Sequence, residues 1–460
     1  MARRPGSGGC TIFLLLSAVI LAVAGPTMAA QRVGRDGTLS VAIDAGPYSI
    51  ENTPAGDEVA MQGFGRNLVP GRPDLPAKIF AVAVPPGARV TEVTCDAGEG
   101  IELPGSYQVP PVRLPRVVGE ENPVAYARDL RTYQDNYAAV YGSNDPYPSE
   151  PGEWVRTAGY RKYDLVDVRI SPFAYSPQSG ALVLYPRVTV NVHYVLPGTP
   201  LAEPARVDSL LRTERTARDI IVNYDQAQAW YSGGRKSRTI GLYDFVIITL
   251  DSLTTAVQPL VDWETAKGRT VNVVTTSWIN TNYTGYDLAE KMRNFLREKY
   301  PSGQWGIEDV LLVGHYDDVP MRRCAQDIGY GEPETDYYYA ELSLPDSQSW
   351  DRNVDHFWGD NVDLIDFYAE VNVGRIPWST PATVQSICEK SVAYENNTDP
   401  GFKRNILLLG AFFWADTDNA VLMEYKVNPT LHPWMSSWTA TRLYEQGYSS
   451  YPMDYNLTNS

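Results

Sequence analysis

Cysteine and histidine are scarce in this sequence, which has four of each in 460 residues. Cys10 falls in the N-terminal leader described below, so three cysteines remain for the folded protein: Cys95, Cys324 and Cys388. Their spacing fits no zinc motif, and the odd number argues against a disulfide framework. Cys388 lies in a helical pattern, "TVQSICEKSVAYEN", and is expected to be a buried thiol.

Positive charge is also in short supply. The 39 lysines and arginines face 55 acidic residues, which gives a formal net charge of −16. Because phosphate binding needs clustered basic side chains, this balance argues against nucleic acid as a partner. The acidic excess is compatible with a hard cation such as calcium, which takes oxygen ligands.

Long apolar runs are missing after residue 30. Residues 1–30 combine a basic start, "MARRPGSGG", an apolar core, "TIFLLLSAVILAVAG", and small residues for cleavage near Ala29 or Ala30. This is the pattern of a secretory signal peptide. No later segment is apolar enough to span a bilayer. We therefore expect a secreted, extracellular protein without a transmembrane segment; attachment to a cell surface through a missing C-terminal region is left open.

The remaining chain changes character near residue 200. Residues 31–204 have β patterns, such as two runs around the turn in "AKIFAVAVPPGARVTEVTC", and no long helix is expected there. Residues 205–240 are polar and rich in arginine, and they predict a linker or a loosely docked helix that is open to proteolysis. From 241 onward strands alternate with amphipathic helices, which predicts a mainly parallel sheet covered on both faces.

Six segments of the second half, in order, resemble the gingipain family of secreted cysteine peptidases: "YDFVIIT", "PLVDWETAKGRTVNVV", "VLLVGHYDDVP", "TDYYYAEL", "EVNVGRIP" and "SVAYENN". In the first half, "RPDLPAKIFAVAVPPGARV" and "SPFAYSPQSGALVLYPRVTVNVHY" are similar to the family's propeptide. The resemblance implies an incomplete caspase-like three-layer α/β/α domain over 241–460. It also implies a β-rich inhibitory prodomain over 31–204, docked over the active-site face, and a maturation cleavage in 205–240.

The resemblance further implies a Cys–His dyad that hydrolyses peptide bonds in protein or peptide substrates, through a thiolate nucleophile and an imidazole. In the family the histidine stands in Gly-His-Gly after a late strand, and the cysteine ends the next strand. Neither is present here, so no catalytic residue is assigned and we expect the dyad to lie beyond Ser460. The alternative is a non-catalytic secreted or cell-surface binding protein that kept the fold and lost the dyad.

A histidine and two aspartates, His315, Asp317 and Asp318, directly follow the predicted strand "DVLLVG". Open parallel sheets place their chemistry at the carboxyl ends of strands. The resemblance implies a calcium-binding aspartate at the position of His315, and this departure should weaken a calcium site because imidazole is a poor calcium ligand.

The segment "DLIDFYAEVNVGR" carries the rest of the calcium site that the resemblance implies. Asp366 and Glu370 would supply carboxylates, and Asp363 and Tyr368 would supply backbone carbonyls. Calcium takes about six to eight oxygens, so Asp317, Asp318 or water would complete the shell. This hypothesis requires both acidic loops to emerge close together, with His315 lining the site. The alternative is an ordinary solvated loop.

Other candidates are less well supported by the sequence. His315 and Cys324 are close in sequence and would form an alternative dyad, but no residue is evident to orient the imidazole. Isolated histidines are expected to be structural or exposed: His193, His356 and His432. Asp416 and Asp418 lie near where a pocket for a basic side chain would form, and the sequence leaves substrate preference open.

Overall fold

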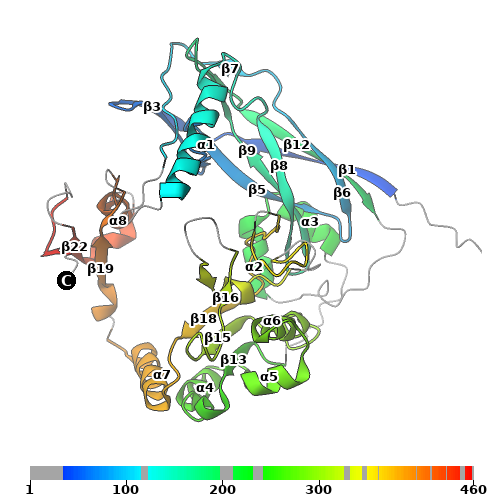
Figure 1. Cartoon of the computed structure of the whole chain (residues 1–460), viewed down its shortest axis with the longest axis vertical. Helices are drawn as coiled ribbons and strands as arrows, with labels where there is room; N and C mark the ends of the chain where they lie inside the picture. Colours follow the sequence, from blue (N-terminus) through cyan, green and yellow to red (C-terminus); the bar gives the residue numbers. More distant parts are fainter. Residues whose placement is uncertain are drawn as a thin grey trace, which may run out of the picture.

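The computed structural model describes residues 35–114, 123–196, 211–231, 242–325, 332–343, 350–360, 362–399, 401–414, 417–430, 432–445 and 451–457. The predicted signal peptide, residues 1–30, lies outside the described residues. A β-rich N-terminal part, which we call the prodomain, lies beside an α/β part that begins at residue 242 (Figure 1).

Twelve strands build the described part of the prodomain, and two of its sheets carry most of the packing. One sheet has the order β1-β12-β6 and the other has the order β4-β5-β9-β8, with antiparallel pairs throughout. Smaller sheets are β2-β3 and β10-β11-β7. The bounds are β1 Arg35–Asp44, β2 Tyr48–Thr53, β3 Gly56–Met61, β4 Gly65–Arg66, β5 Pro76–Val84, β6 Arg89–Asp96, β7 Ile101–Glu102, β8 Gly152–Tyr160, β9 Tyr163–Ile170, β10 Phe173–Ser176, β11 Ala181–Leu184 and β12 Arg187–Leu196.

Alternating β-branched residues determine how these two sheets pack. Val188, Val190 and Val192 of β12 face Val166 and Val168 of β9 in one apolar core, and all five are fully or almost fully buried. Side chains at every second position point to the same face of a strand, so this period gives each sheet one apolar side. The predicted β character of the first half is confirmed.

Two helical segments depart from the sequence predictions. Helix α1 spans Pro123–Tyr141, where no long helix was expected. The helix has few aliphatic residues, so it shows little apolar periodicity at helical spacing. Instead Tyr133, Tyr137 and Tyr141 stack at four-residue spacing, and Tyr141 contacts Tyr175 of β10.

The predicted linker also contains structure. Helices α2 (Leu211–Ile220) and α3 (Tyr224–Tyr231) pack on the prodomain through Ala217, Ile221, Tyr224 and Ala227, which are buried against β5 and β9. Residues 211–231 are therefore an integral part of the prodomain. The basic stretch 232–240 lies outside the described residues.

The α/β part is a three-layer arrangement around a parallel sheet of order β14-β13-β15-β18, as predicted. On one face, α4 and α7 cover Ile247 and Val313; on the other, α5 and α6 cover Ile248 and Leu312 (Figure 1). The bounds are β13 Phe245–Thr249, α4 Gln258–Ala266, β14 Val271–Thr275, α5 Thr276–Asn282, α6 Leu288–Lys299, β15 Asp309–Val313, β18 Asn372–Ile376 and α7 Pro381–Asn396.

The last described segments form a second, separate unit. Strands β19, β22 and β23 pair in parallel in that order, and α8 packs on β19. The strands after residue 241 were expected to share one mainly parallel sheet, but β18 and β19 fall in different sheets. The bounds are β16 Arg322–Arg323, β17 Glu334–Thr335, β19 Asn405–Gly410, β20 Phe412–Trp414, β21 Thr417–Asp418, α8 Ala420–Val427, β22 Thr439–Tyr444 and β23 Tyr455–Asn456.

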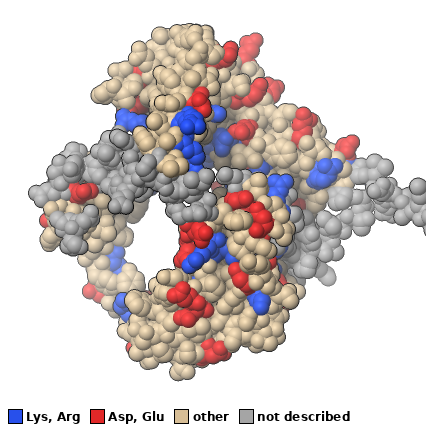
Figure 2. Space-filling model, in the orientation of Figure 1, with Lys and Arg blue, Asp and Glu red and all other residues tan. Residues whose placement is uncertain are grey.

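Acidic side chains stand out on the α/β part in the space-filling view, with basic side chains between them (Figure 2). Among the helices that the structure describes, none has both the length and the apolar character needed to cross a membrane.

Candidate functional site

The loop after β15 is held by backbone and side-chain hydrogen bonds. The N–H groups of Asp318 and Val319 both donate to the carbonyl of His315 at 2.9 Å, which closes a tight turn. Ser379 links this turn to the end of β18: its Oγ accepts the N–H of His315 at 2.9 Å and donates to Asp318 Oδ2 at 2.5 Å. The His315 ring is 41% exposed and lies 3.1 Å from Asp317 Oδ2.

Cys324 does not have the environment of an activated nucleophile. It precedes β17 in a small hairpin, where its N–H donates to the carbonyl of Pro333 at 2.8 Å. Burial raises the pKa of its thiol, and a raised pKa disfavours the thiolate that attacks a carbonyl. Within the described part of the chain, no hydrogen bond or ion pair joins Cys324 to His315. The alternative dyad therefore lacks structural support.

The other sequence candidates have structural partners or lie outside the described residues. His193 Nδ1 is 3.1 Å from Thr38 Oγ1 across two strands. His356 stacks on Tyr286 and lies 3.2 Å from Asp351, and the ring of His432 contacts Tyr425 and Trp434. Asp418 accepts the N–H of Ala420 at 2.9 Å. Asp416 lies outside the described residues, and Cys388 is fully buried on the inner face of α7, as expected.

The two acidic loops emerge at opposite edges of the sheet, which corrects the expectation that Asp317, Asp318 and His315 lie at the predicted calcium site. Strands β15 and β18 are parallel with Asp309 beside Asn372, so the loop after β15 lies at the carboxyl edge and the segment before β18 lies at the amino edge. The four steps between the five residues of a strand, at about 3.3 Å each, separate the edges by about 13 Å. Asp317 and Asp318 therefore cannot complete a site at Asp366 and Glu370, and His315 does not line it.

At the amino edge, three buried carboxylates gather around one serine. Asp366 and Glu370 are each 4% exposed, and Glu341 is 1% exposed. Ser343 Oγ lies 3.1 Å from Asp366 Oδ2 and 3.2 Å from Glu370 Oε1, while the Ser343 N–H donates to Glu341 Oε1 at 2.9 Å. One hydroxyl proton thus serves two carboxylates. Glu341 and Ser343 were not predicted as site residues, although an acidic residue directly after the apolar run "YYYA" indicates a buried carboxylate.

The mutual repulsion of these carboxylates appears in their pKa values. Burial first, and then the charge of Glu341, raise the pKa of Asp366 to about 7. The same two causes, in the same order, together with Asp366 itself, raise the pKa of Glu370 well above its ordinary value. Crowded carboxylates of this kind are relieved by a proton or by a cation.

Asp363 stands apart from this cluster. Its Oδ1 accepts the N–H of Arg352 at 2.6 Å and its Oδ2 accepts that of Gly359 at 2.7 Å, so the carboxylate closes a local loop. The side chain of Tyr368 points instead to the prodomain, where its hydroxyl donates to Asp167 Oδ1 at 2.8 Å. The backbone carbonyls of Asp363 and Tyr368 as calcium ligands stay a prediction.

The cluster fits calcium in its chemistry, because its side chains present oxygen atoms that carry excess negative charge. The carboxylate oxygens nevertheless accept backbone N–H donors: Leu342 to Glu370 at 2.5 Å, and Tyr368 to Asp366 at 3.0 Å. As the side chains stand, no three acidic, histidine or cysteine residues of the described ranges are arranged to hold a metal ion.

The same segment forms the contact with the prodomain. Arg156 of β8 donates to the carbonyl of Ile365 at 2.9 Å and to that of Asp366 at 3.0 Å. The N–H of Gly159 donates to Asp366 Oδ2 at 2.8 Å. These groups meet the α/β part at the amino edge of its sheet. Sequence analysis expected the prodomain over the active-site face, which in an open parallel sheet lies at the carboxyl ends of the strands.

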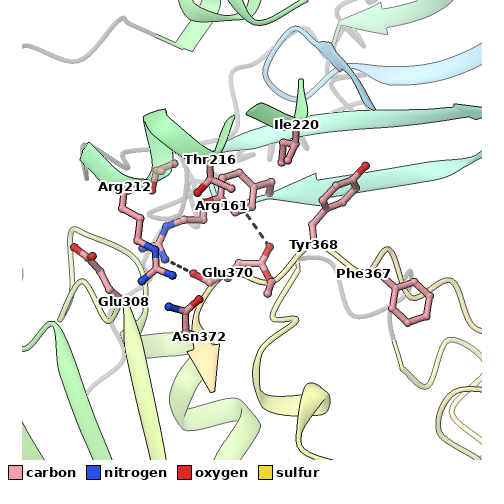
Figure 3. A pocket seen from close by; sticks show the side chains of 12 residues that line it. Arg161, Arg212, Thr216, Ile220, Glu308, Phe367, Tyr368, Glu370 and Asn372 are labelled. Carbon is pink, nitrogen blue, oxygen red and sulfur yellow. Dashed lines mark hydrogen bonds between the residues drawn. The ribbon is translucent and has the colours of Figure 1, made fainter. Parts of the chain in front are cut away.

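A cavity of about 270 Å³ lies at this contact, between α2 and the residues before β15 and β18. Figure 3 shows Arg161 and Arg212 directed from the prodomain toward Glu370 and Glu308. Arg212 lies 3.2 Å from Asp309. Burial raises the pKa of Asp309, but hydrogen bonds from Asn372 and Arg269 outweigh it and leave the pKa lowered. Charges from both parts of the chain therefore meet in pairs at this surface.

Comparison with protein families gives two matches in chain order. The propeptide model of family C25 matches residues 57–228, and the model of peptidase family C25 matches residues 241–459. The first match includes α2 and most of α3, in agreement with their packing on the prodomain. No curated protein matches the chain.

Several solved structures are similar. The complex of the pro- and mature domains of RgpB from Porphyromonas gingivalis matches at 14% identity, over 41% of this chain and 93% of that chain, with a TM-score of 0.29. The Arg-specific cysteine proteinase gingipain R (RgpB) matches at 18% identity, over 46% and 43%, with a TM-score of 0.34. Latent dimeric PorU from Porphyromonas gingivalis matches at 12% identity, over 83% and 40%, with a TM-score of 0.27.

This chain thus spans less than half of the gingipain R chain that it matches. The two family models together cover most of its length, with the propeptide first and the peptidase second. The chain belongs to the gingipain family, peptidase family C25, and joins that family's β-rich propeptide to part of its α/β cysteine peptidase domain.

Proposed function

We propose that this chain is the N-terminal portion of a secreted cysteine endopeptidase zymogen, whose Cys–His dyad is supplied by residues that follow Ser460. The observation that carries the proposal is the order of the two family matches on one chain, with the propeptide seated against the peptidase part through buried polar contacts. Export is supported by the signal-peptide pattern of residues 1–30. The substrates are proteins or peptides, and the propeptide acts as the inhibitor.

Extending the reading frame tests this function. A chain continued through a Gly-His-Gly segment and the following cysteine should hydrolyse peptide substrates only after cleavage in 232–240, and thiol alkylation should abolish the activity. Residues 31–460 alone should show none. Hydrolysis by residues 31–460 that is lost in Cys324→Ala would contradict the proposal, as would an extended chain that lacks both dyad residues. The latter outcome would favour the binding protein.

We also propose that the carboxylate cluster binds one structural calcium ion. Asp366 and Glu370 would be the principal ligands, with Glu341 beside them and the backbone carbonyls of Asp363 and Tyr368 available. Support comes from the burial of like charges around a single hydroxyl proton. Arg293 already pairs with Glu341 at 3.2 Å, so the cation would supply positive charge chiefly to Asp366 and Glu370.

Thermal unfolding of the full chain at pH 8, with calcium or with a chelator, tests the site. Calcium should raise the midpoint for the wild type, and Asp366→Asn should remove most of that rise because it removes a charged ligand. Asp317→Asn is the control, since its exposed carboxylate lies at the opposite edge of the sheet. A calcium response that is absent from the wild type, or unchanged in Asp366→Asn, would contradict the proposal.

A further inference from the structure

A two-residue hairpin turn carries the prodomain onto the α/β part. Tyr160 at the end of β8 pairs with Tyr163 at the start of β9, so Arg161 and Lys162 form the turn between them. The guanidinium of Arg161 donates to three backbone carbonyls of the α/β part: Tyr300 at 3.2 Å, Ile307 at 3.4 Å and Glu370. Its backbone N–H donates to Glu370 Oε1 at 3.4 Å, and Figure 3 shows both links to Glu370.

The turn has a backbone conformation that suits glycine rather than arginine. Arg161 has φ = +50°, in the left-handed region. Two-residue hairpin turns with positive φ favour Asn or Gly, because a Cβ is strained there. A strained non-glycine residue points to a role for its side chain. Here that side chain reaches the α/β part, so the residue is unfavourable for the hairpin and favourable for the contact.

The second turn residue secures the hairpin from the prodomain side. Lys162 is 7% exposed and forms an ion pair with Glu214 of α2. Glu214 also accepts hydrogen bonds from Tyr163 at 2.9 Å and Tyr224 at 2.6 Å. The turn is thus fixed to α2 on one side while Arg161 projects from the other, so the hairpin presents Arg161 on a rigid support.

Arg156 extends the same contact along β8. Its Nε donates to Asp167 Oδ2 at 2.9 Å, and Asp167 is fully buried. That ion pair orients the planar guanidinium, whose other two nitrogens donate to the carbonyls of Ile365 and Asp366. Arginine is suited to this task because one rigid fork can bind a carboxylate and two carbonyls together.

All these acceptors belong to the amino edge of the parallel sheet. Ile307 precedes β15, and residues 365–370 precede β18. In an open parallel sheet a substrate binds at the opposite, carboxyl edge. The contact is therefore built to hold the prodomain in place without occupying the edge where substrate would bind.

We propose that the hairpin tip, with Arg161 at its centre and Arg156 beside it, is an anchor that keeps the prodomain bound after the chain is cut between its two parts. The anchor is distinct from whatever element blocks the active site. This inference rests on the proposed zymogen function, but its test measures association of the two parts and needs no hydrolysis. Failure of the anchor and failure of the zymogen function can therefore be told apart, because a chain without peptidase activity still reports on the anchor.

The test uses the full chain, cut with trypsin at the basic residues of 232–240, which include Arg235, Lys236 and Arg238. N-terminal sequencing identifies the cut, and gel filtration over a dilution series gives the dissociation constant of the two fragments. Arg161→Gly is compared with the wild type and with Arg169→Ala. Arg169 is the control because it lies on the same hairpin and pairs with the exposed Glu153 at 2.6 Å.

In the wild type and in Arg169→Ala, the prodomain fragment and the α/β fragment should elute together as one complex. Arg161→Gly should raise the dissociation constant at least tenfold, while the melting temperature of its released prodomain stays equal or rises, because glycine relieves the positive φ. Fragments of Arg161→Gly that associate as tightly as the wild type would overturn the anchor. A released Arg161→Gly prodomain that melts earlier than the wild-type fragment would also overturn it, because Arg161 would then serve the fold of the hairpin.

Discussion

Replacing Lys162 with methionine should release helix α2 from the prodomain. Lys162 is almost completely buried and pairs with Glu214, whose side chain is 29% exposed. Methionine keeps most of the apolar stem but leaves the carboxylate with only two tyrosine hydroxyls as donors. Breaking a fully buried ion pair costs about 3–5 kcal/mol. Glu214 is partly exposed and keeps two hydrogen bonds. We therefore expect Lys162→Met to weaken the docking of α2 on the prodomain by about 2–3 kcal/mol.

The effect should depend on pH in a definite direction. Burial raises the pKa of Glu214, but hydrogen bonds from Lys162 and Tyr224 outweigh it and leave the pKa lowered from 4.5. A lowered pKa stabilises the docked helix above pH 4.5, and this contribution is lost as the pH falls through the folded-state value. Without Lys162, Glu214 loses both the hydrogen bond and the positive charge that lower its pKa. The difference between wild type and Lys162→Met should therefore be largest near pH 7 and shrink below about pH 4.

Limited trypsin digestion measures this docking, because α2 contains three cleavage sites that a packed helix protects: Arg212, Arg215 and Arg218. Lys162→Met should be cut within α2 about 30–150 times faster than the wild type, the ratio that corresponds to about 2–3 kcal/mol. Arg169→Met is the matched control, since its pair with Glu153 is exposed and worth at most about 1 kcal/mol. An unchanged rate in Lys162→Met, or an equal increase in Arg169→Met, would refute the assignment of 211–231 to the prodomain.

Three further outcomes are expected in the α/β part. Phe295→Ala removes a fully buried ring under the sheet and should lower the free energy of unfolding by about 3–5 kcal/mol in urea titrations. Arg322→Lys should cost about 1–3 kcal/mol in the same assay, since lysine cannot donate to both oxygens of Asp287, each 2.8 Å away, while covering the ring of Trp358. Cys324 should react with a disulfide reagent at pH 7.5 more slowly than a free cysteine peptide, because burial raises its pKa; equal rates would contradict its placement.

Local pattern was sufficient to predict most of the elements. The alternation that ends in Val188, Val190 and Val192 defines one face of a strand at a period of two. Met292, Phe295 and Leu296 define one face of α6 at helical spacing, and all three are fully buried. These signals are read from neighbours in sequence, because secondary structure is decided by which side chains share a face. The order of strands and helices after residue 242 likewise indicated a parallel sheet with two covered faces.

Helix α1 escaped prediction, and residues 211–231 were expected only as a linker or a loosely docked helix, for a physical reason. Their surfaces are tyrosine-rich or polar, and their stability comes from partners distant in sequence, such as Tyr175 for Tyr141 and Lys162 for Glu214. A helix of this kind carries little apolar periodicity of its own, since tertiary contacts provide most of its stability.

The placement of the acidic residues was likewise decided by tertiary structure. The sequence identified Asp366, Glu370 and the acids after "DVLLVG" as candidate calcium ligands, and the composition indicated an acidic protein. Only the parallel register of β15 and β18 separates those acids to opposite edges of the sheet, and only the fold brings Glu341 and Ser343 to Asp366 and Glu370. The sequence alone thus determined most of the elements and the family, through local periodicity and ordered motifs. The tertiary structure decided which charges meet, because strand direction and long-range packing set distances that no local pattern contains.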